Sequence, residues 1–235
     1  MRLIIVRHGE SHSNAGRDRI ALPDAEGDRL TDRGREQAGA AATALAELGA
    51  DRLLASPMRR AAETAAVIGE RLGLAVETNP LIHELREVEG YGELEVAEQQ
   101  AQRWSKRMTE NHDDEHFAPG GAESFADVVG RVRAFKEQLA GCPAASVQVA
   151  VSHGIFTRFF FLDSLFGDAF SPAHLTRIWH LRTINCGLSL FTLGERGRSI
   201  DPQLDDWACL SWMSPPGGPA GLRAADRRAS AATAR

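Results

Sequence analysis

The sequence predicts an α/β protein of three layers, in which helices cover both faces of a largely parallel central sheet. The alternation of two kinds of segment indicates this fold. Short apolar stretches of strand length alternate along the chain with longer segments of helical periodicity, and such alternation is typical of parallel strands joined by helices. With 235 residues, 43% of them hydrophobic, the chain can enclose one sizeable core and is too short for two full domains.

The expected elements follow one another in a regular order. Residues 2–6 (RLIIV) read as a short buried strand, and residues 31–49 as an Ala-rich helix with Thr31 as N-cap and Gly49 as stop. The pattern then repeats, with strands at 52–55, 75–78 and 147–152 and helices at 58–72 and 155–166. Two final strands are expected at 178–184 and 188–193.

The segment between about residues 80 and 145 departs from this order. It is rich in Glu, Gln and Arg and has few β-branched runs, which predicts an inserted, mainly helical cap. Residues 1–212 are therefore predicted to form a single domain that carries this cap. Residues 213–235 are rich in Ala, Arg, Gly and Pro and bury too little apolar surface to fold, so we expect a disordered tail.

Composition excludes several classes of protein. The formal net charge is −5 and the tail is basic, so the body is more acidic still, which argues against a nucleic-acid surface. No apolar run reaches the roughly 20 residues of a membrane span, and the N-terminal run LIIV is too short for a signal peptide. We expect a cytoplasmic protein that binds no membrane. The widely spaced Cys142, Cys186 and Cys209 predict neither a disulfide framework nor a cysteine zinc site.

Three charged motifs follow predicted strands. Arg7-His8 follows the first strand, a segment from Ser56 to Arg60 follows the second, and Ser152-His153-Gly154 follows the strand at 147–152. Ligands of open α/β sheets bind at the carboxyl ends of the strands, so these motifs are expected to meet at one site. Helices that begin after the last two motifs would also direct N–H groups at that site, which favours an anion.

The side chains of these motifs suit phosphoryl transfer. Arginine presents a planar fork of donors that fits phosphate oxygens. A neutral imidazole is a nucleophile, and cations around it keep it neutral at pH 7. A departing alcohol would also need a proton donor, for which a carboxylic acid is the usual choice. Because the arginines supply positive charge, no metal and no cofactor is expected.

Several blocks in order along residues 3–193 resemble the histidine phosphatase superfamily, the phosphoglycerate mutase-like proteins. The first block, Arg7-His8-Gly9-Glu10-Ser11 with Asn14, is similar to the family's RHG signature. The others are Leu30-Thr31-Asp32-Arg33-Gly34 with Gln37-Ala38, Ser56 with Arg60-Ala61 and Thr64-Ala65, Leu85-Arg86-Glu87, Gly120-Gly121-Ala122-Glu123-Ser124 with Asp127-Val128, and Val151-Ser152-His153-Gly154 with Arg158.

The resemblance implies a role for each matching residue. His8 would become phosphorylated while Arg7, Arg60 and His153 hold the phosphoryl group, and Glu87 would donate the proton. Asn14 would contact the phosphoryl group as well. Further substrate contacts are expected from Ser11, Gly154 and Arg86, although Ser11 could instead cap a turn and Arg86 could form a salt bridge within the cap.

More than one glutamate can take the role of the acid, because the chain departs from the family pattern after Glu87. It reads Gly90-Tyr91-Gly92-Glu93-Leu94-Glu95 where the family often has Gly-x-Trp-Glu-Gly. Glu84 and Glu89 therefore stay open as alternatives. The His112-Asp113-Asp114-Glu115-His116 stretch matches an inverted zinc-protease motif, but it runs into a loop-like segment and is interpreted as a solvated charged loop.

The function predicted is a phosphomonoesterase that acts on a small phosphorylated metabolite. Phosphoglycerate mutases tend to follow the acid with Arg-His-Tyr-Gly, whereas Val88 follows Glu87 here. A mutase and a non-catalytic phosphate-binding module are the alternatives. Sugar phosphates, phosphoglycolipid precursors, nucleotide monophosphates and a cobalamin-precursor phosphate all stay open as substrates. A homodimer through Trp179, Trp207 and Trp212 is one interpretation of these residues, and burial within the monomer is the other.

Overall fold

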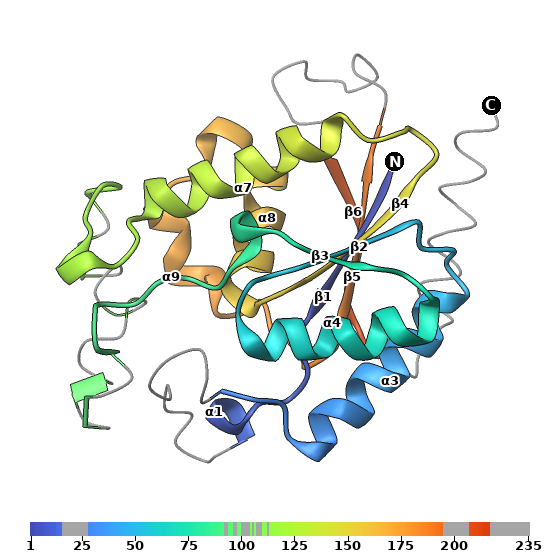
Figure 1. Ribbon diagram of the computed structural model, residues 1–235. Helices are drawn as coiled ribbons and strands as arrows, with labels where there is room; N and C mark the ends of the chain where they lie inside the picture. Colours follow the sequence, from blue (N-terminus) through green and yellow to red (C-terminus); the bar gives the residue numbers. More distant parts are fainter. Residues whose placement is uncertain are drawn as a thin grey trace.

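The centre of the molecule is a mixed β-sheet between two layers of helices (Figure 1), which confirms the predicted fold class. The computed structural model describes residues 1–15, 28–91, 94–95, 98–99, 104, 106, 110–111, 113–194 and 207–216. Within these residues the strands are β1 (Arg2–Arg7), β2 (Arg52–Ala55), β3 (Val76–Thr78), β4 (Val147–Ser152), β5 (Leu188–Leu193) and β6 (Trp207–Ser214).

The helices of the described residues follow the predicted alternation. The α-helices are α1 (His12–Ala15), α3 (Asp32–Ala46), α4 (Arg59–Leu72), α7 (Phe125–Ala140), α8 (Gly154–Phe166) and α9 (Leu175–Ile178). Short 3-10 helices are η1 (Pro80–Ile82), η3 (Pro119–Gly121), η4 (Gly167–Ala169) and η5 (Pro172–His174). Predicted boundaries hold where local signals are strong: the Thr31 side chain caps α3 by accepting from the Gly34 N–H, and Gly73 ends α4 with φ 67°.

The order of the strands is β3-β2-β4-β1-β5-β6. Strands β3, β2, β4 and β1 are parallel, whereas β5 and β6 are antiparallel to their neighbours. In the register, Arg7 pairs with Ser152 and Ala55 pairs with Val151. The carboxyl ends of strands β1, β2 and β4 therefore lie side by side, and the motifs that follow them meet at this end of the sheet.

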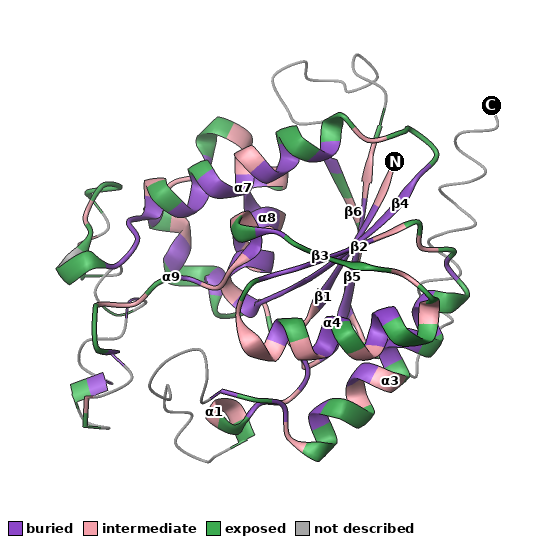
Figure 2. Ribbon diagram, viewed as in Figure 1, coloured by how far each residue is buried: buried purple, intermediate pink, exposed green. Residues whose placement is uncertain are grey.

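Alternate residues of β1 build two separate cores, one on each face of the sheet. Leu3 and Ile5 are fully buried against α7 and α8, while Ile4 and Val6 are buried in the cluster formed with α3 and α4. Figure 2 shows the central strands β1, β2 and β4 mostly buried and the outward faces of these helices exposed. Because both of their faces are covered, these central strands are largely apolar runs, and this feature made them predictable from sequence.

Two expectations about the C-terminal part of the chain were wrong. Residues 178–184 are not a strand: Ile178 ends α9, and the following residues form turns and loop. The last strand is instead β6, which pairs with β5 along the edge of the sheet. Because β6 extends to Ser214, residues 213 and 214 belong to the sheet and not to the predicted tail. Residues 217–235 lie outside the described residues.

The predicted cap contains a helix that packs in the main body. Helix α7 lies within residues 80–145 and packs against α8, and the buried Lys136 and Asp163 side chains join the two helices at 2.7 Å. Most residues between 92 and 112 lie outside the described part of the chain, so a mainly helical cap stays a prediction there.

Candidate active site

The loop after β1 lies against the start of α3 with almost no space between the two backbones. A Cβ atom on Gly9 would lie 2.5 Å from the Gly34 carbonyl oxygen, and one on Gly34 would lie 2.1 Å from the Glu10 carbonyl oxygen. The Gly9 N–H donates to Oγ1 of Thr64 at 3.0 Å. Glycine is thus needed at both positions because of close backbone approach, and the loop that carries His8 is held firmly by α3 and α4.

A pair of alanine substitutions in α3 tests this contact. Gly34→Ala is expected to lower the free energy of unfolding by about 1–3 kcal/mol because the new methyl group displaces the backbone at Glu10. A shift of the loop by about 1 Å would also lower kcat/KM by roughly 100-fold. The matched control is Gly39→Ala in the same helix, where a Cβ meets nothing within 4 Å. Urea denaturation should show Gly39→Ala unchanged or stabilised, and equal effects of the two substitutions would contradict the account.

The tautomer of His8 follows from its hydrogen bonds. Nδ1 of His8 lies 2.7 Å from the Gly9 carbonyl oxygen. A carbonyl oxygen only accepts, so Nδ1 carries the proton and Nε2 presents its lone pair. The Nε–H of Arg60 donates to this Nε2 at 3.1 Å. The ring is 3% exposed, so His8 is a buried imidazole with an oriented, nucleophilic nitrogen beside an arginine.

Arg60 is held in place by a carboxylate that the sequence analysis missed. Its Nη1 lies 2.8 Å from Oδ2 of Asp28, and Asp28 also accepts from the Oγ and backbone N–H of Ser13. Asp28 is 5% exposed. Because one end of the Arg60 fork is fixed by Asp28, the other end is directed at His8.

The second predicted histidine lies beside the first. The His8 and His153 ring centroids are 5.1 Å apart. Nε2 of His153 lies 2.8 Å from Oγ of Ser56, a residue of the second motif. His153 is fully buried, and its Nδ1 has no hydrogen-bond partner within the described part of the chain. A buried polar atom of this kind is uncommon in folded proteins, which makes Nδ1 of His153 a candidate for contact with a substrate.

Burial and positive charge favour the neutral form of both rings. Burial is the largest cause that lowers the pKa of His8 well below 6.5, and Arg60 and Arg7 lower it further. The pKa of His153 is also well below 6.5, because of burial first and then Arg60 and His8. The sequence-based expectation of a neutral nucleophile among cations is therefore supported by the geometry.

These pKa shifts predict how stability depends on pH. Below pH 6.5 the histidines of the unfolded chain bind protons that buried His8 and His153 do not, so the free energy of unfolding should fall as the pH falls. The loss is up to about 1.4 kcal/mol per histidine for each pH unit. Urea denaturation should therefore show a lower free energy of unfolding at pH 5.5 than at pH 7.5. A His153→Asn variant should show about half this change. A free energy of unfolding that is higher at pH 5.5 than at pH 7.5 would contradict the pKa shifts.

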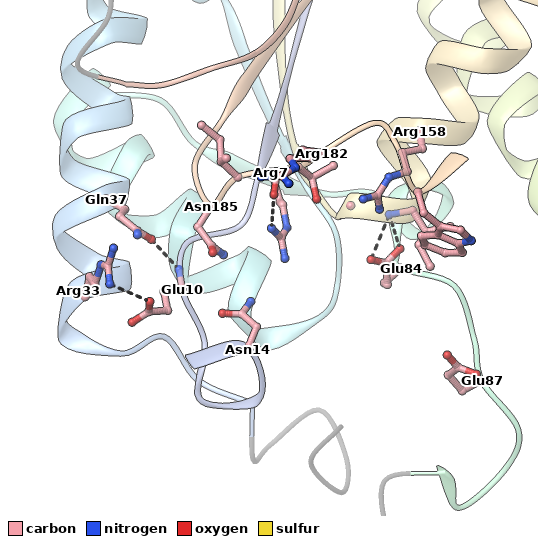
Figure 3. A pocket seen from close by; sticks show the side chains of 15 residues that line it. Arg7, Glu10, Asn14, Arg33, Gln37, Glu84, Glu87, Arg158, Arg182 and Asn185 are labelled. Carbon is pink, nitrogen blue, oxygen red and sulfur yellow. Dashed lines mark hydrogen bonds and ion pairs between the residues drawn. The ribbon is translucent and has the colours of Figure 1, made fainter. Parts of the chain in front are cut away.

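A pocket of about 1090 Å³ opens at the carboxyl end of the sheet (Figure 3), and His8 and His153 are buried next to it. Their chain neighbours Arg7 and Gly154 line the pocket, as does Asn14. The structure thus brings together most of the predicted site: Arg7, His8, Asn14, Arg60, His153 and Gly154.

Two of the three candidate acids line the pocket. Glu84 points at the first turn of α8, where its carboxylate accepts from the N–H groups of Ile155 and Phe156 at 3.2–3.3 Å (Figure 3). Glu87 lies farther along the same loop, and its Oε2 accepts from the Trp104 N–H at 2.9 Å. Glu89 is exposed and is not among the lining residues. The start of α8, expected to bind the substrate's anion, holds the Glu84 carboxylate in this structure.

Two predicted substrate contacts lie away from the pocket lining. The Arg86 side chain is 68% exposed and lies 3.6 Å from Glu123, which is the salt bridge that the sequence analysis kept as an alternative. Ser11 is fully buried, and its Oγ lies 3.2 Å from Oγ of Ser13. Ser11 therefore supports the loop, where its backbone N–H donates to Oδ1 of Asn14.

The loop between α9 and β5 forms a wall of the pocket, and its first part, up to Ile184, was expected to be a strand. The Thr183 carbonyl accepts from Nη1 of Arg7 at 3.1 Å, and Nδ2 of Asn185 donates to the His8 carbonyl at 3.1 Å. Cys186 has a φ of 53° and its N–H donates to the Arg7 carbonyl. The Asn185-Cys186-Gly187 sequence is a turn signal, and it lies between the two strands that were expected at 178–184 and 188–193.

The described residues give no sign of a metal centre or of a membrane-spanning helix. In this part of the chain no group of three or more His, Cys, Asp and Glu residues is arranged to hold a metal ion, and no helix is long and apolar enough to cross a membrane. Of the candidate zinc motif, His112 lies outside the described residues and the His116 side chain is 76% exposed. All three cysteines are free.

The chain is similar over most of its length to curated proteins and solved structures. It is 29% identical over 214 residues to "Probable phosphoglycerate mutase GpmB" of Yersinia enterocolitica, covering 91% of this chain and 90% of the relative. A structure described as "Mycobacterial hydrolase 1" has a TM-score of 0.70 at 27% identity, covering 91% and 99% of the two chains. A mycobacterial glucosyl-3-phosphoglycerate phosphatase in complex with VO3 has a TM-score of 0.70 at 25% identity, with the same coverage.

The family follows from a match that spans nearly the whole chain. The model of the histidine phosphatase superfamily (branch 1) matches residues 3–206, a range that includes every strand-end motif of the site. The resemblance predicted from those motifs is confirmed, and the chain belongs to the histidine phosphatase superfamily.

Proposed function

We propose that the protein is a metal-independent phosphomonoesterase that hydrolyses a small phosphorylated metabolite through a phosphohistidine at His8. The observation that carries this proposal is the orientation of His8, whose protonated Nδ1 is fixed by the Gly9 carbonyl and whose Nε2 faces Arg60. Arg7 and His153 lie beside it and complete an electropositive site that suits a phosphoryl dianion.

In the first step Nε2 of His8 attacks phosphorus and the ester P–O bond breaks. The phosphoryl oxygens take over the Arg60 Nε–H that His8 accepts in the free protein, and they also bind Arg7, His153 and Asn14. The leaving alcohol oxygen takes a proton from Glu87, which becomes a carboxylate. The products are phospho-His8 and the free alcohol.

In the second step water attacks phospho-His8 and the P–N bond breaks. The Glu87 carboxylate accepts a proton from this water, which restores the acid for the next cycle. Inorganic phosphate leaves, and His8 regains its lone pair on Nε2. Arginines stabilise the charge on the transferring oxygens throughout, so the cycle requires no metal ion.

A phosphoglycerate mutase is the second candidate, because the curated relative at 29% identity carries that name as a probable function. A mutase returns the phosphoryl group to a hydroxyl of a sugar acid and must exclude water from phospho-His8. Hydrolysis is favoured by the sequence after Glu87, which is Val88-Glu89-Gly90-Tyr91 and lacks the Arg-His-Tyr-Gly of mutases.

The test is a panel of small phosphomonoesters, including 2- and 3-phosphoglycerate, incubated with EDTA-treated protein. Release of inorganic phosphate that survives EDTA supports the proposal. Interconversion of the phosphoglycerates without release would make the protein a mutase, and phosphate binding without any turnover would make it a binding module.

A further inference from the structure

Two arginines of the pocket wall differ from the other arginines of the site in their ion pairing. Arg158 lies in the second turn of α8, and Arg182 lies in the loop before β5. Arg60 pairs with Asp28, and Arg33, across the pocket, pairs with Glu10 at 3.6 Å. Among the described residues, neither Arg158 nor Arg182 has a carboxylate within 4.0 Å.

Arg158 is nevertheless fixed in one orientation. Its Nε donates to the Leu181 carbonyl at 2.9 Å, and its guanidinium lies 5.3 Å from the centre of the Trp179 ring. A guanidinium held by its Nε and stacked on an aromatic ring presents both Nη groups in a fixed fork, the arrangement that binds carboxylates and phosphates in bidentate fashion.

Arg158 lies close to the position proposed for the phosphoryl group. A Cβ atom on Gly154 would lie 3.4 Å from Nη1 of Arg158, 3.6 Å from Nε of Arg7 and 3.2 Å from Oγ1 of Thr183. Polar groups of α8, β1 and the loop before β5 thus converge around Gly154. A group bound by Arg158 would be only a few bonds from a phosphoryl group bound by Arg7.

The carboxylate that acts on Arg158 does not cancel the charge of its guanidinium. Glu84 acts on Arg158 electrostatically, but its oxygens already accept from the Ile155 and Phe156 N–H groups. Burial lowers the pKa of Arg158, and a cation that has lost water binds an anion more strongly. Trp179 and Ile184, each 40% exposed, provide apolar surface next to the arginines for a carbon skeleton.

We propose that Arg158 and Arg182 form a second anion subsite, which binds a carboxylate or a second phosphate on the alcohol portion of the substrate. This inference rests on the proposed function, and it narrows the substrate class to compact phosphomonoesters with two anionic groups. Arg158 is the main determinant because its fork is fixed, and Arg182 contributes charge at the exposed rim.

The test compares three substrates with the same three-carbon skeleton: glycerol 3-phosphate, 3-phosphoglycerate and glycerol 1,3-bisphosphate. Wild-type protein should turn over at least one of the two doubly anionic compounds with a kcat/KM about tenfold or more above that of glycerol 3-phosphate. The preferred compound distinguishes a carboxylate subsite from a phosphate subsite. Conversion of 3-phosphoglycerate counts as turnover whichever product forms.

Arg158→Gln should reduce this preference by about tenfold or more, and Arg182→Gln by less. The control is Arg177→Gln in α9, an exposed arginine outside the pocket lining, which should leave the preference unchanged. Equal turnover of all three compounds by the wild type would overturn the subsite while leaving the phosphomonoesterase intact. A preference that survives in Arg158→Gln would overturn it as well.

If the protein turns over none of the three compounds, hydrolysis gives no readout of the subsite, and binding tests the subsite by itself. Calorimetry with His8→Ala protein should show tighter binding of the preferred doubly anionic compound than of glycerol 3-phosphate. The additional Arg158→Gln substitution should remove the difference. Equal affinities in the His8→Ala protein would overturn the subsite.

Discussion

Replacement of His8 by alanine is expected to lower kcat/KM for every phosphomonoester by at least about 10³-fold. The imidazole is the proposed nucleophile, and its Nε2 has the fixed orientation that attack on phosphorus requires. Water in the space left by the ring would lack this orientation. Steady-state hydrolysis of 4-nitrophenyl phosphate by matched preparations measures the effect.

Folding has to be separated from chemistry in this comparison, because His8 is buried and bonded to Arg60. His8→Asn keeps a polar side chain at the position and should lose as much activity as His8→Ala. His116→Ala removes an exposed histidine and serves as the control that keeps full activity. Substantial turnover by a folded His8 variant would show that another group attacks phosphorus.

Replacement of Glu87 by glutamine is expected to lower kcat by about 10²–10⁴-fold for alkyl phosphates. Glutamine cannot donate the proton that an alkoxide leaving group needs. A 4-nitrophenyl phosphate releases a weakly basic anion, so its hydrolysis should fall much less. The ratio of the two effects, measured in single-turnover experiments, identifies the general acid independently of folding.

Glu84→Gln is the matched comparison, because Glu84 lies on the same loop and lines the same pocket. Its carboxylate binds the N–H groups that begin α8, so its loss should reduce stability and affect all leaving groups by a similar factor. If the strong dependence on the leaving group followed Glu84→Gln instead, Glu84 would be the acid and the assignment of Glu87 would be wrong.

The elements that could be predicted from sequence are those whose signal is local. Strands 52–55, 147–152 and 188–193 match the structure to the residue, because buried strands are continuous apolar runs bounded by turn residues. Residues 178–184 have a strand-like composition, but tertiary contacts override it: α9 ends there, and the loop binds Arg7 and Arg158. Strand β6 mixes polar and apolar residues on the sheet edge and gave no such signal.

The same distinction explains which site residues could be predicted. Topology alone brings together the residues that follow strands or begin helices at the carboxyl end of the sheet. These residues are Arg7, His8, Arg60 and His153. Asp28, Thr183 and Asn185 come from loops, whose positions depend on packing with α1, α4 and β1. Arg86 is next to Glu87 in sequence, yet its side chain lies by Glu123 because that buried carboxylate is within reach.

The central claim is that His8 carries the phosphoryl group between substrate and water. The most direct measurement is rapid quenching into alkali during turnover of a small phosphomonoester, followed by mass spectrometry of the peptide that contains His8. The account predicts a phosphoryl group on His8 that is stable in alkali and labile in acid and that forms in the presence of EDTA. When hydrolysis of phospho-His8 is rate-limiting, its amount should approach the enzyme concentration. Turnover with no phosphoryl group on His8 at any quench time would contradict it.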